Sequence, residues 1–214
     1  MNLFQQIKEA KEQLQGVVMA TPLSENLNIS NEFNATVLLK REDLQTVRSY
    51  KIRGAYNKIR TLSNEEKAQG VICASAGNHA QGVAYSCKLL QIKGKIYMPK
   101  TTPKQKVKQV NLFGGTFVEI VLTGDTFDDA YSAALEDATT NKLTFIHPFD
   151  DEKVIAGQGT VGLEILESYK KPIDYVFVPL GGGGLSAGLS EVFKHLSPDT
   201  KIIGVEPEGA PSMK

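Results

Sequence analysis

The stretch VFVPLGGGGLSAGLSEVF, residues 176–193, contains the transition that decides the fold. An apolar run predicts a strand, four consecutive glycines follow it, and apolar residues at helical spacing then predict a helix. Glycine loses more backbone entropy on folding than any other residue, so we expect these glycines to let a ligand approach the backbone closely. Phosphate at the helix N-terminus is the favoured ligand, and a flexible turn is the alternative.

Strand and helix patterns alternate along the rest of the chain. This alternation predicts an α/β fold in which a parallel sheet carries helices on both faces. Ligands of such sheets bind beyond the carboxyl ends of the strands. The predicted strands cover residues 35–40, 71–75, 95–99, 116–121, 143–147, 174–180 and 201–206, and the predicted helices lie near residues 3–15, 50–62, 78–91, 104–113, 126–139, 153–169 and 186–196.

Bulk composition narrows the classes of partner. The 214 residues include 24 basic and 24 acidic side chains, so no global field is expected to recruit nucleic acid or an acidic membrane. No apolar run approaches the roughly 20 residues that span a bilayer, and residues 1–20 are amphipathic rather than a signal peptide. We therefore predict a cytoplasmic protein without nucleic-acid or membrane partners.

The cysteines and histidines do not form a metal-binding pattern. Cys73 and Cys87 lie in apolar surroundings and outside any C-x-x-C pair, which favours inert core thiols. The three histidines, His79, His147 and His195, are far apart and never occur at H-x-x-x-H spacing. The sequence therefore predicts no metal site.

The stretch SYKIRGAYNKI, residues 49–59, has the spacing of a helix with one buried face, and Ser49 is its predicted N-cap. Arg48, Lys51 and Arg53 crowd the first turn, where the helix dipole favours anions instead. These cations, the dipole and partial desolvation predict a lowered pKa for Lys51 and thus a nucleophilic amine. A nearby anion would explain why the cations are tolerated. The alternative is a solvated surface lysine.

The stretch CASAGNHAQGVA, residues 73–84, forms a second strand-to-helix loop. We expect Gly77 to allow a sharp turn and Asn78 to be the N-cap of the next helix. The backbone N–H groups of such a helix start can bind a carboxylate. Ordinary capping of the helix is an equally good interpretation of the spacing.

The glycine loop also supports a rival interpretation. Gly182, Gly184 and Ala187 fit the pattern G-x-G-x-x-A, and Glu206 ends the next predicted strand. This arrangement is close to a dinucleotide-binding fingerprint with its ribose-binding acid, and alone it would indicate NAD. A dinucleotide site does not, however, explain Lys51 or the asparagine loop.

Four sequence blocks together resemble the threonine dehydratases (threonine ammonia-lyases), which are fold type II pyridoxal-phosphate enzymes, as are serine racemase and serine dehydratase. The resemblance implies a tryptophan synthase β-like α/β fold with two parallel or mostly parallel sheets and helices on both faces. It also implies an incomplete large domain (residues 1–44 and 149–214), a small α/β domain (residues 45–148) and no regulatory domain. The blocks are SYKIRGA at 49–55, SAGNHAQGVA at 75–84, GQGT at 157–160 and GGGGL at 181–185.

The resemblance also implies roles for individual residues, with pyridoxal 5′-phosphate as the cofactor. Lys51 matches the lysine that binds the cofactor as an imine and moves the substrate Cα proton, and Asn78 matches the asparagine that bonds the cofactor 3′-hydroxyl. Tyr50 is expected against the cofactor ring. The residues that match the phosphate loop are Gly181, Gly182, Gly183, Gly184 and Leu185, and those in the loop around the substrate carboxylate are Ser75, Ala76, Gly77 and His79.

The implied reaction is α,β-elimination from L-threonine, which yields 2-oxobutanoate and ammonia for isoleucine biosynthesis, in a protein expected to be a homo-oligomer. The alternatives are an L-serine dehydratase, a serine racemase, a noncatalytic cofactor-binding fragment and an NAD-binding module. The chain stops at EGAPSMK, residues 208–214, before the family segment that contacts the pyridine nitrogen. We therefore expect a truncated chain with little activity of its own.

Overall fold

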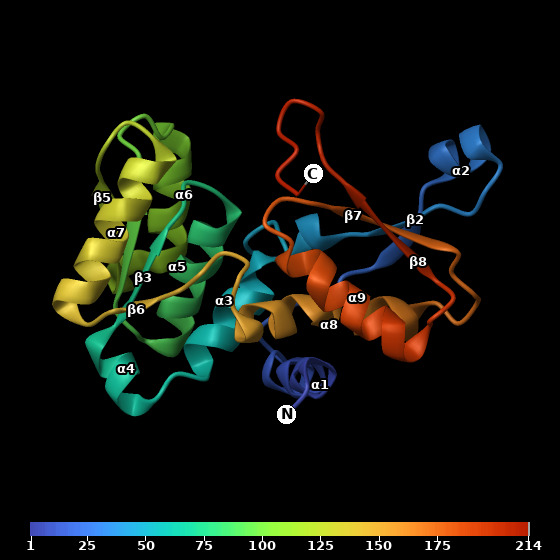
Figure 1. Ribbon diagram of the computed structural model, residues 1–214, viewed down its shortest axis with the longest axis horizontal. Coiled ribbons are helices and arrows are strands. Elements are labelled where there is room, and N and C mark those ends of the chain that lie inside the picture. Colours follow the sequence, from blue (N-terminus) through green and yellow to red (C-terminus); the bar gives the residue numbers. More distant parts are fainter. Residues whose placement is uncertain (214) are drawn as a thin grey trace.

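The computed structural model describes residues 1–213 and contains one larger sheet and two strand pairs (Figure 1). The larger sheet has four strands in the order β5-β4-β3-β6, and every neighbouring pair is parallel. Its carboxyl-terminal edge therefore gathers the loops that lead into the next helices. The strands are β3 (Val71–Ala74), β4 (Gly94–Met98), β5 (Val118–Leu122) and β6 (Thr144–Phe145).

Helices cover both faces of the four-stranded sheet, as predicted. On one face, Ile72 and Ala74 pack with Ala134 and Ala138 of α7 (Phe127–Asn141). The main core lies on the other face, which is covered by α3 (Lys51–Arg60), α5 (Asn78–Leu90) and α6 (Lys104–Gly114). Cys73 and Cys87 are fully buried in this core, where burial raises the pKa of both thiols, so the prediction of core cysteines is confirmed.

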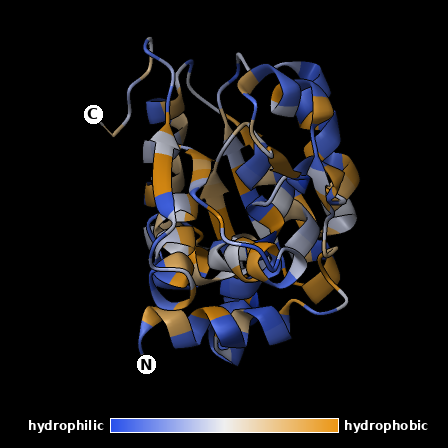
Figure 2. Ribbon diagram, turned by 90° about the vertical axis from the view of Figure 1, so that its right-hand side faces the viewer, coloured by the Kyte–Doolittle hydropathy of each residue, from blue (hydrophilic) through white to orange (hydrophobic). Residues whose placement is uncertain are grey.

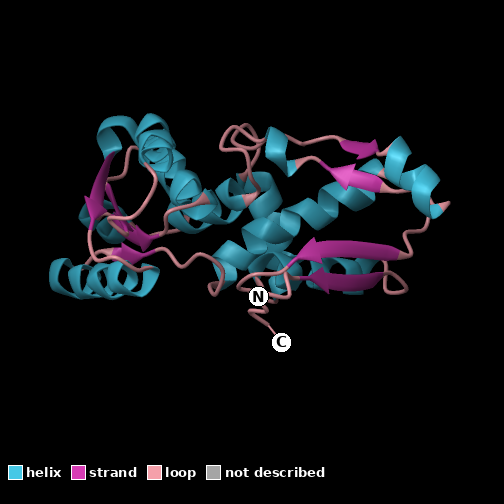
Figure 3. Ribbon diagram, turned by 90° about the horizontal axis from the view of Figure 1, so that it is seen from above, coloured by secondary structure: helices cyan, strands magenta, loops and turns pink. Residues whose placement is uncertain are grey.

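The two strand pairs lie on the opposite side of the molecule from the four-stranded sheet (Figure 3). β7 (Tyr175–Pro179) is parallel to β8 (Lys201–Val205), whereas β1 (Leu23–Glu25) is antiparallel to β2 (Leu38–Lys40). Within the described residues, the strands outside the larger sheet thus form two separate pairs, of which only β7–β8 is parallel.

The β7–β8 pair is covered on only one face within the described part of the chain. Its inner residues pack with α8 (Glu152–Ser168) and α9 (Gly184–Leu196) around Val178 and Leu189. The alternate residues Tyr175, Phe177 and Ile203 are exposed on the other face. The alternating pattern predicts helices on both faces of a sheet, but among the described residues they cover only one face of the β7–β8 pair.

Five further elements complete the fold. In α1 (Leu3–Gln13), Asn2 caps the helix, and Ile7 and Ala10 are buried in a cluster with residues of α8 and α9. Its many hydrophilic residues colour much of its ribbon blue in Figure 2. None of the helices within residues 1–213 has the length and apolar character needed to cross a membrane. The remaining elements, which the sequence patterns did not predict, are α2 (Leu27–Phe33), α4 (Asn64–Gln69), η1 (Glu42–Leu44) and η2 (Gly115–Phe117).

Helix α3 is held between α5 and α8 through glycines that allow the backbones to touch. A Cβ atom placed on Gly82 would lie 3.0 Å from the Lys51 carbonyl group, and one placed on Gly157 would lie 2.5 Å from the Arg53 carbonyl oxygen. A Cβ on Gly54 would lie 2.4 Å from the side-chain amide of Gln158. The GQGT block at residues 157–160 is therefore a helix-packing element that sets the position of α3.

Candidate functional site

Lys51 is the first residue of α3, and its half-buried amine faces a backbone carbonyl. Lys51 Nζ donates a hydrogen bond to the Pro148 carbonyl oxygen over 2.7 Å and lies 5.4 Å from the centre of the Tyr50 ring. Burial lowers the pKa of Lys51 to about 8. The fraction of free amine near neutral pH is therefore far larger than for an ordinary lysine, as nucleophilic chemistry requires.

The predicted cap of α3 is wrong. Tyr50, not Ser49, is in the cap position, and among the described residues no side chain caps the helix. The Ser49 hydroxyl is instead buried without a hydrogen-bond partner in residues 1–213.

The prediction that neighbouring cations lower the pKa of Lys51 is also wrong. Arg48 is exposed. Arg53 is fully buried and pairs with Glu42 at 2.8 Å and Glu164 at 2.6 Å, so its charge is balanced on the side of α3 that packs against α8. Desolvation alone accounts for the lowered pKa of Lys51.

The asparagine loop joins β3 to α5 at the carboxyl edge of the sheet. Ser75, Ala76 and Gly77 are half-buried, and Ser75 Oγ accepts a hydrogen bond from the Gly77 N–H over 3.2 Å. Gly77 occupies the cap position, so the predicted cap at Asn78 is wrong by one residue, and Asn78 is the exposed first residue of the helix. No described atom lies within 4 Å of a Cβ placed on Gly77, which leaves room for a ligand at the helix start.

His79 is buried and neutral. Its Nε2 lies 2.9 Å from the Ile146 carbonyl oxygen, and because a carbonyl only accepts, Nε2 carries the proton. Burial lowers the pKa of His79 to about 3. Its Nδ1 is buried without a partner among residues 1–213, so it is an acceptor available to a ligand or water.

The glycine loop leads from β7 into α9 as predicted, and its members have different structural reasons to be glycine. Gly183 has φ +80°, a conformation that side chains rarely adopt. A Cβ on Gly182 would lie 2.2 Å from the Phe149 ring, and one on Gly184 would lie 2.7 Å from the Phe149 carbonyl oxygen. Gly181 is exposed, and no described atom lies within 4 Å of its Cβ position, so this end of the loop is open to a ligand.

The segment that joins these features is the β6–α8 loop, residues 146–151. Ile146 accepts from His79, Pro148 accepts from Lys51, and Phe149 packs against the glycine loop. The sequence predictions did not single out this loop, although its position between a predicted strand and a predicted helix could have indicated it. Asp151, which accepts hydrogen bonds from the N–H groups of residues 153 and 154 and so caps α8, could also have indicated where this loop ends.

These residues fit pyridoxal phosphate. Lys51 supplies a primary amine of lowered pKa for the cofactor aldehyde, and the open Gly181 position lies beside the N-terminus of α9, whose first N–H groups favour a phosphate. The open Gly77 position likewise leaves the N-terminus of α5 accessible to a ligand. The N–H groups at this helix start favour a carboxylate.

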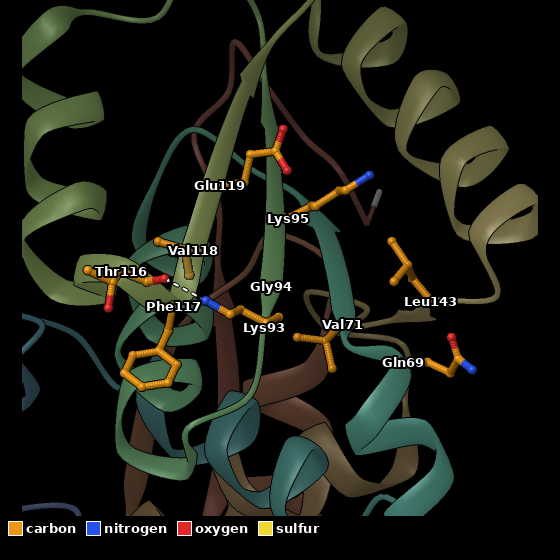
Figure 4. A pocket seen from close by; sticks show the side chains of 10 residues that line it. All are labelled: Gln69, Val71, Lys93, Gly94, Lys95, Thr116, Phe117, Val118, Glu119 and Leu143. Carbon is orange, nitrogen blue, oxygen red and sulfur yellow. Dashed lines mark hydrogen bonds between the residues drawn. The ribbon is translucent and has the colours of Figure 1, made fainter.

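The structure contains two notable cavities, of which one adjoins the Lys51 site and the other lies away from it. A groove of about 710 Å³ runs between β2 and β7, and its lining includes Tyr50 and Leu185, so it adjoins the lysine and the glycine loop. A pocket of about 330 Å³ lies at the opposite edge of the four-stranded sheet, where β3, β4 and β5 begin (Figure 4). Its lining includes Lys95 and Glu119, and Lys93 Nζ donates a hydrogen bond to the Thr116 carbonyl oxygen over 3.0 Å. That edge is not where parallel sheets bind ligands.

Comparison with known proteins gives relatives over nearly the whole chain. The chain is 57% identical over 205 residues to a biosynthetic L-threonine dehydratase of Halalkalibacterium halodurans, and 55% identical over 206 residues to that of Bacillus subtilis. Each match covers 96% of this chain and 49% of the relative, so the chain spans about half the length of these curated relatives.

Solved structures show the same arrangement of the backbone. The processed form of threonine deaminase isoform 2 from Solanum lycopersicum superposes with a TM-score of 0.93 at 48% identity, covering 99% of this chain and 57% of that one. Maize serine racemase superposes with a TM-score of 0.91 at 33% identity, covering 97% and 62% of the two chains. The predicted fold type is confirmed by these neighbours.

A family model described as pyridoxal-phosphate dependent enzyme matches residues 14–214, which include every site residue described above. This match confirms the predicted cofactor and disfavours NAD. Because this match covers nearly the whole chain, and because the Lys51 amine and the open glycine loop fit the cofactor, the chain belongs to the pyridoxal-phosphate dependent enzymes.

Proposed function

We propose that this chain carries the cofactor lysine and the substrate-binding loop of an L-threonine ammonia-lyase, which converts L-threonine to 2-oxobutanoate and ammonia in isoleucine biosynthesis. The observation that carries the proposal is the convergence of Lys51, His79 and the glycine loop on the β6–α8 loop. Identity of 57% to a relative named as a biosynthetic L-threonine dehydratase supports threonine as the substrate. The small domain is residues 45–148, and residues 1–44 with 149–214 belong to the large domain.

Lys51 binds the cofactor and then removes the Cα proton of the substrate. Its pKa of about 8 lets the amine accept a proton near neutral pH and return it without a large energetic penalty. Pyridoxal phosphate, when bound, supplies an electron sink for the electron pair that the proton leaves at Cα. Tyr50, next to the amine, borders the ring of the cofactor.

The two helix N-termini bind the two anionic ends of the reacting molecules. The N–H groups of Gly181 to Leu185 bind the cofactor phosphate, and the loop from Ser75 to Gly77 binds the substrate carboxylate. Asn78, exposed at the start of α5, bonds the cofactor hydroxyl. His79 is neutral, so it orients the loop and accepts a hydrogen bond at Nδ1 and adds no positive charge.

The first test is chemical identification of the cofactor lysine. The chain is mixed with pyridoxal phosphate, reduced with borohydride to fix the cofactor on the lysine that binds it, and mapped by mass spectrometry. We expect the label on Lys51 and its loss in Lys51→Ala. Lys104→Ala is the matched control, because Lys104 is also the first residue of a helix but is exposed. Label spread equally over Lys104 and other surface lysines would contradict the proposal.

The second test concerns the substrate. The 2-oxo acid formed from L-threonine and from L-serine is measured at equal concentrations with the same protein. Faster turnover of threonine is the expected result. Faster turnover of serine, or racemisation of serine without 2-oxo acid, would instead favour the serine enzymes that share the fold.

A further inference from the structure

His147 is the second residue of the β6–α8 loop and lies between Ile146 and Pro148, whose carbonyl groups hold His79 and Lys51. Its Nδ1 accepts hydrogen bonds from the backbone N–H groups of Asp150 over 2.7 Å and Phe149 over 3.4 Å. Because backbone N–H groups only donate, Nδ1 must be unprotonated in this arrangement. The imidazole therefore bends the loop back on itself only while it is neutral, with its proton on Nε2.

Aromatic packing holds the imidazole in this orientation. The His147 ring contacts the Phe149 ring edge to face, with 4.7 Å between the centroids, and Phe145 of β6 lies 6.3 Å away on a tilted plane. Such pairs favour defined ring orientations over rotation. The ring that accepts from the backbone is thus also fixed against the side chain that fills the space beside Gly182.

The bend determines what the loop presents to the site. Between His147 and Asp150, the chain exposes the Pro148 carbonyl oxygen to Lys51 and turns the Phe149 ring toward Gly182. Both contacts lie inside the segment that the two hydrogen bonds to Nδ1 close. Loss of these bonds would free both the acceptor that holds the amine and the ring that supports the glycine loop.

We propose that His147 is a positioning residue, whose neutral Nδ1 shapes the β6–α8 loop so that it holds the Lys51 amine and supports the glycine loop. This inference rests on the proposed role of Lys51 as the cofactor lysine. His147 itself touches neither the amine nor the glycines in the contacts described above, so it acts through Pro148 and Phe149.

Burial favours the neutral form of His147 more strongly than the surrounding charges oppose it. Burial is the main cause that lowers the pKa of His147 below 6.5, and Lys51 of α3 lowers it further. Asp150 and Asp151 act in the opposite direction, but Asp151 is paired with Lys58 of α3 at 2.7 Å. His79 of α5, which also interacts with His147, is neutral itself. Protonation would turn Nδ1 into a donor, so the loop arrangement is expected to weaken only as the pH falls below 6.5.

Two substitutions separate the acceptor from the ring. His147→Asn retains an oxygen acceptor close to the position of Nδ1 and does not titrate, whereas His147→Leu removes the acceptor and keeps an apolar side chain. His195→Asn is the matched control, because His195 is partly exposed on α9, where it stacks on Phe4 far from this loop in the sequence.

The readout is the pKa of Lys51 in the cofactor-free chain, taken from the pH dependence of its acylation rate as measured peptide by peptide. The midpoint of this dependence does not change with reagent access. We expect it near 8 in the unchanged chain, in His147→Asn and in His195→Asn. In His147→Leu the freed amine becomes solvated, so its midpoint rises by about one unit and its free fraction at pH 8 falls about fivefold.

Two results would overturn the proposal. One is an unchanged midpoint in His147→Leu, and the other is an equal rise in His147→Leu and His147→Asn, which would assign the effect to the aromatic packing and not to the acceptor. If His147→Leu does not fold, ¹⁵N NMR of the unchanged chain decides the matter. A neutral imidazole protonated at Nε2 supports the proposal, and one protonated at Nδ1 contradicts it.

Failure of this inference can be told apart from failure of the proposed function. Borohydride labelling identifies the cofactor lysine without reference to His147. Label on Lys51 together with an unchanged midpoint in His147→Leu would reject the role of His147 alone. Label on a different lysine would reject the proposed function, whatever the midpoint of Lys51.

Discussion

Lys51 and Arg53 are two residues apart at the start of α3, yet the surroundings of their charged groups differ. The guanidinium of Arg53 is fully buried and bonded to the carboxylates of Glu42 and Glu164 and to the Thr160 hydroxyl. The amine of Lys51 is half-buried and bonded to a neutral carbonyl. The charge of Arg53 is thus balanced by carboxylates, whereas that of Lys51 is not.

The difference explains the opposite pKa shifts of the two groups. Burial alone would lower the pKa of Arg53, but its hydrogen bonds and charge interactions with Glu42 and Glu164 outweigh burial and raise it. No such countercharge contributes to the lowered pKa of Lys51, for which burial is the cause. The Arg53 side therefore holds α3 against η1 and α8, while the Lys51 side retains an amine that can lose its proton.

The largest effect is expected from removing the balanced charge. Arg53→Met removes the cation that pairs with the carboxylates of Glu42 and Glu164. Lys40, which lies 2.5 Å from Glu164, is then the cation that remains beside them. Breaking a buried ion pair from one side typically costs about 3–5 kcal/mol, so we expect a loss of this size in the free energy of unfolding, measured by urea denaturation.

Arg41→Met is the control for this prediction. Arg41 pairs with Asp43 at 2.8 Å, but both side chains are exposed. Exposed pairs contribute little, so urea denaturation should show no clear change. An equal loss in Arg41→Met and Arg53→Met would contradict the contrast between the two sides of α3.

A smaller effect is expected where α3 meets α8 through glycine. Gly157→Ala places a Cβ 2.5 Å from the Arg53 carbonyl oxygen and 2.6 Å from Gly54 Cα, and these backbone atoms can yield only if the helices separate. We expect a loss of about 2 kcal/mol in the free energy of unfolding, although alanine is otherwise preferred to glycine within a helix. Gly209→Ala is the control, because no described atom lies within 4 Å of its Cβ position. Unchanged or increased stability of Gly157→Ala would show that the helices separate easily.

The balanced side of α3 is the part that sequence patterns could not predict. The helix itself follows from the spacing of Ile52, Tyr56 and Ile59, all of which are buried. Glu164, however, is 111 positions from Arg53 in the sequence, and no local pattern connects them. Pairing over such a distance depends on the crossing of α3 and α8, which only the folded structure determines.

The site shows the same limit. Motif spacing identified Lys51, the asparagine loop and the glycine loop because each has its own local sequence features. The role of the β6–α8 loop depends on contacts between segments, such as that of Lys51 with Pro148, 97 positions away. The short elements α2 and β1 were missed because seven and three residues are too few to establish a period.

The smallest effect, and one of opposite sign, is expected from Lys51 itself. Lys51→Met removes an amine whose charged form is disfavoured by burial, so we expect a gain on the order of 0.5 kcal/mol in the free energy of unfolding at pH 7. The folded chain lowers the pKa of Lys51 from 10.5 to about 8, so between these values the unfolded chain binds more protons. Stability due to this group therefore rises with pH in that window.

The advantage of Lys51→Met over the unchanged chain should accordingly shrink and then reverse between pH 8 and pH 10, as measured by urea denaturation at each pH. Lys104→Met is the matched control at an exposed helix start and should show no such trend. If Lys51→Met were instead less stable at pH 7, the amine would stabilise α3 much as Arg53 does. The contrast between an unbalanced functional charge and a balanced structural one would then be lost.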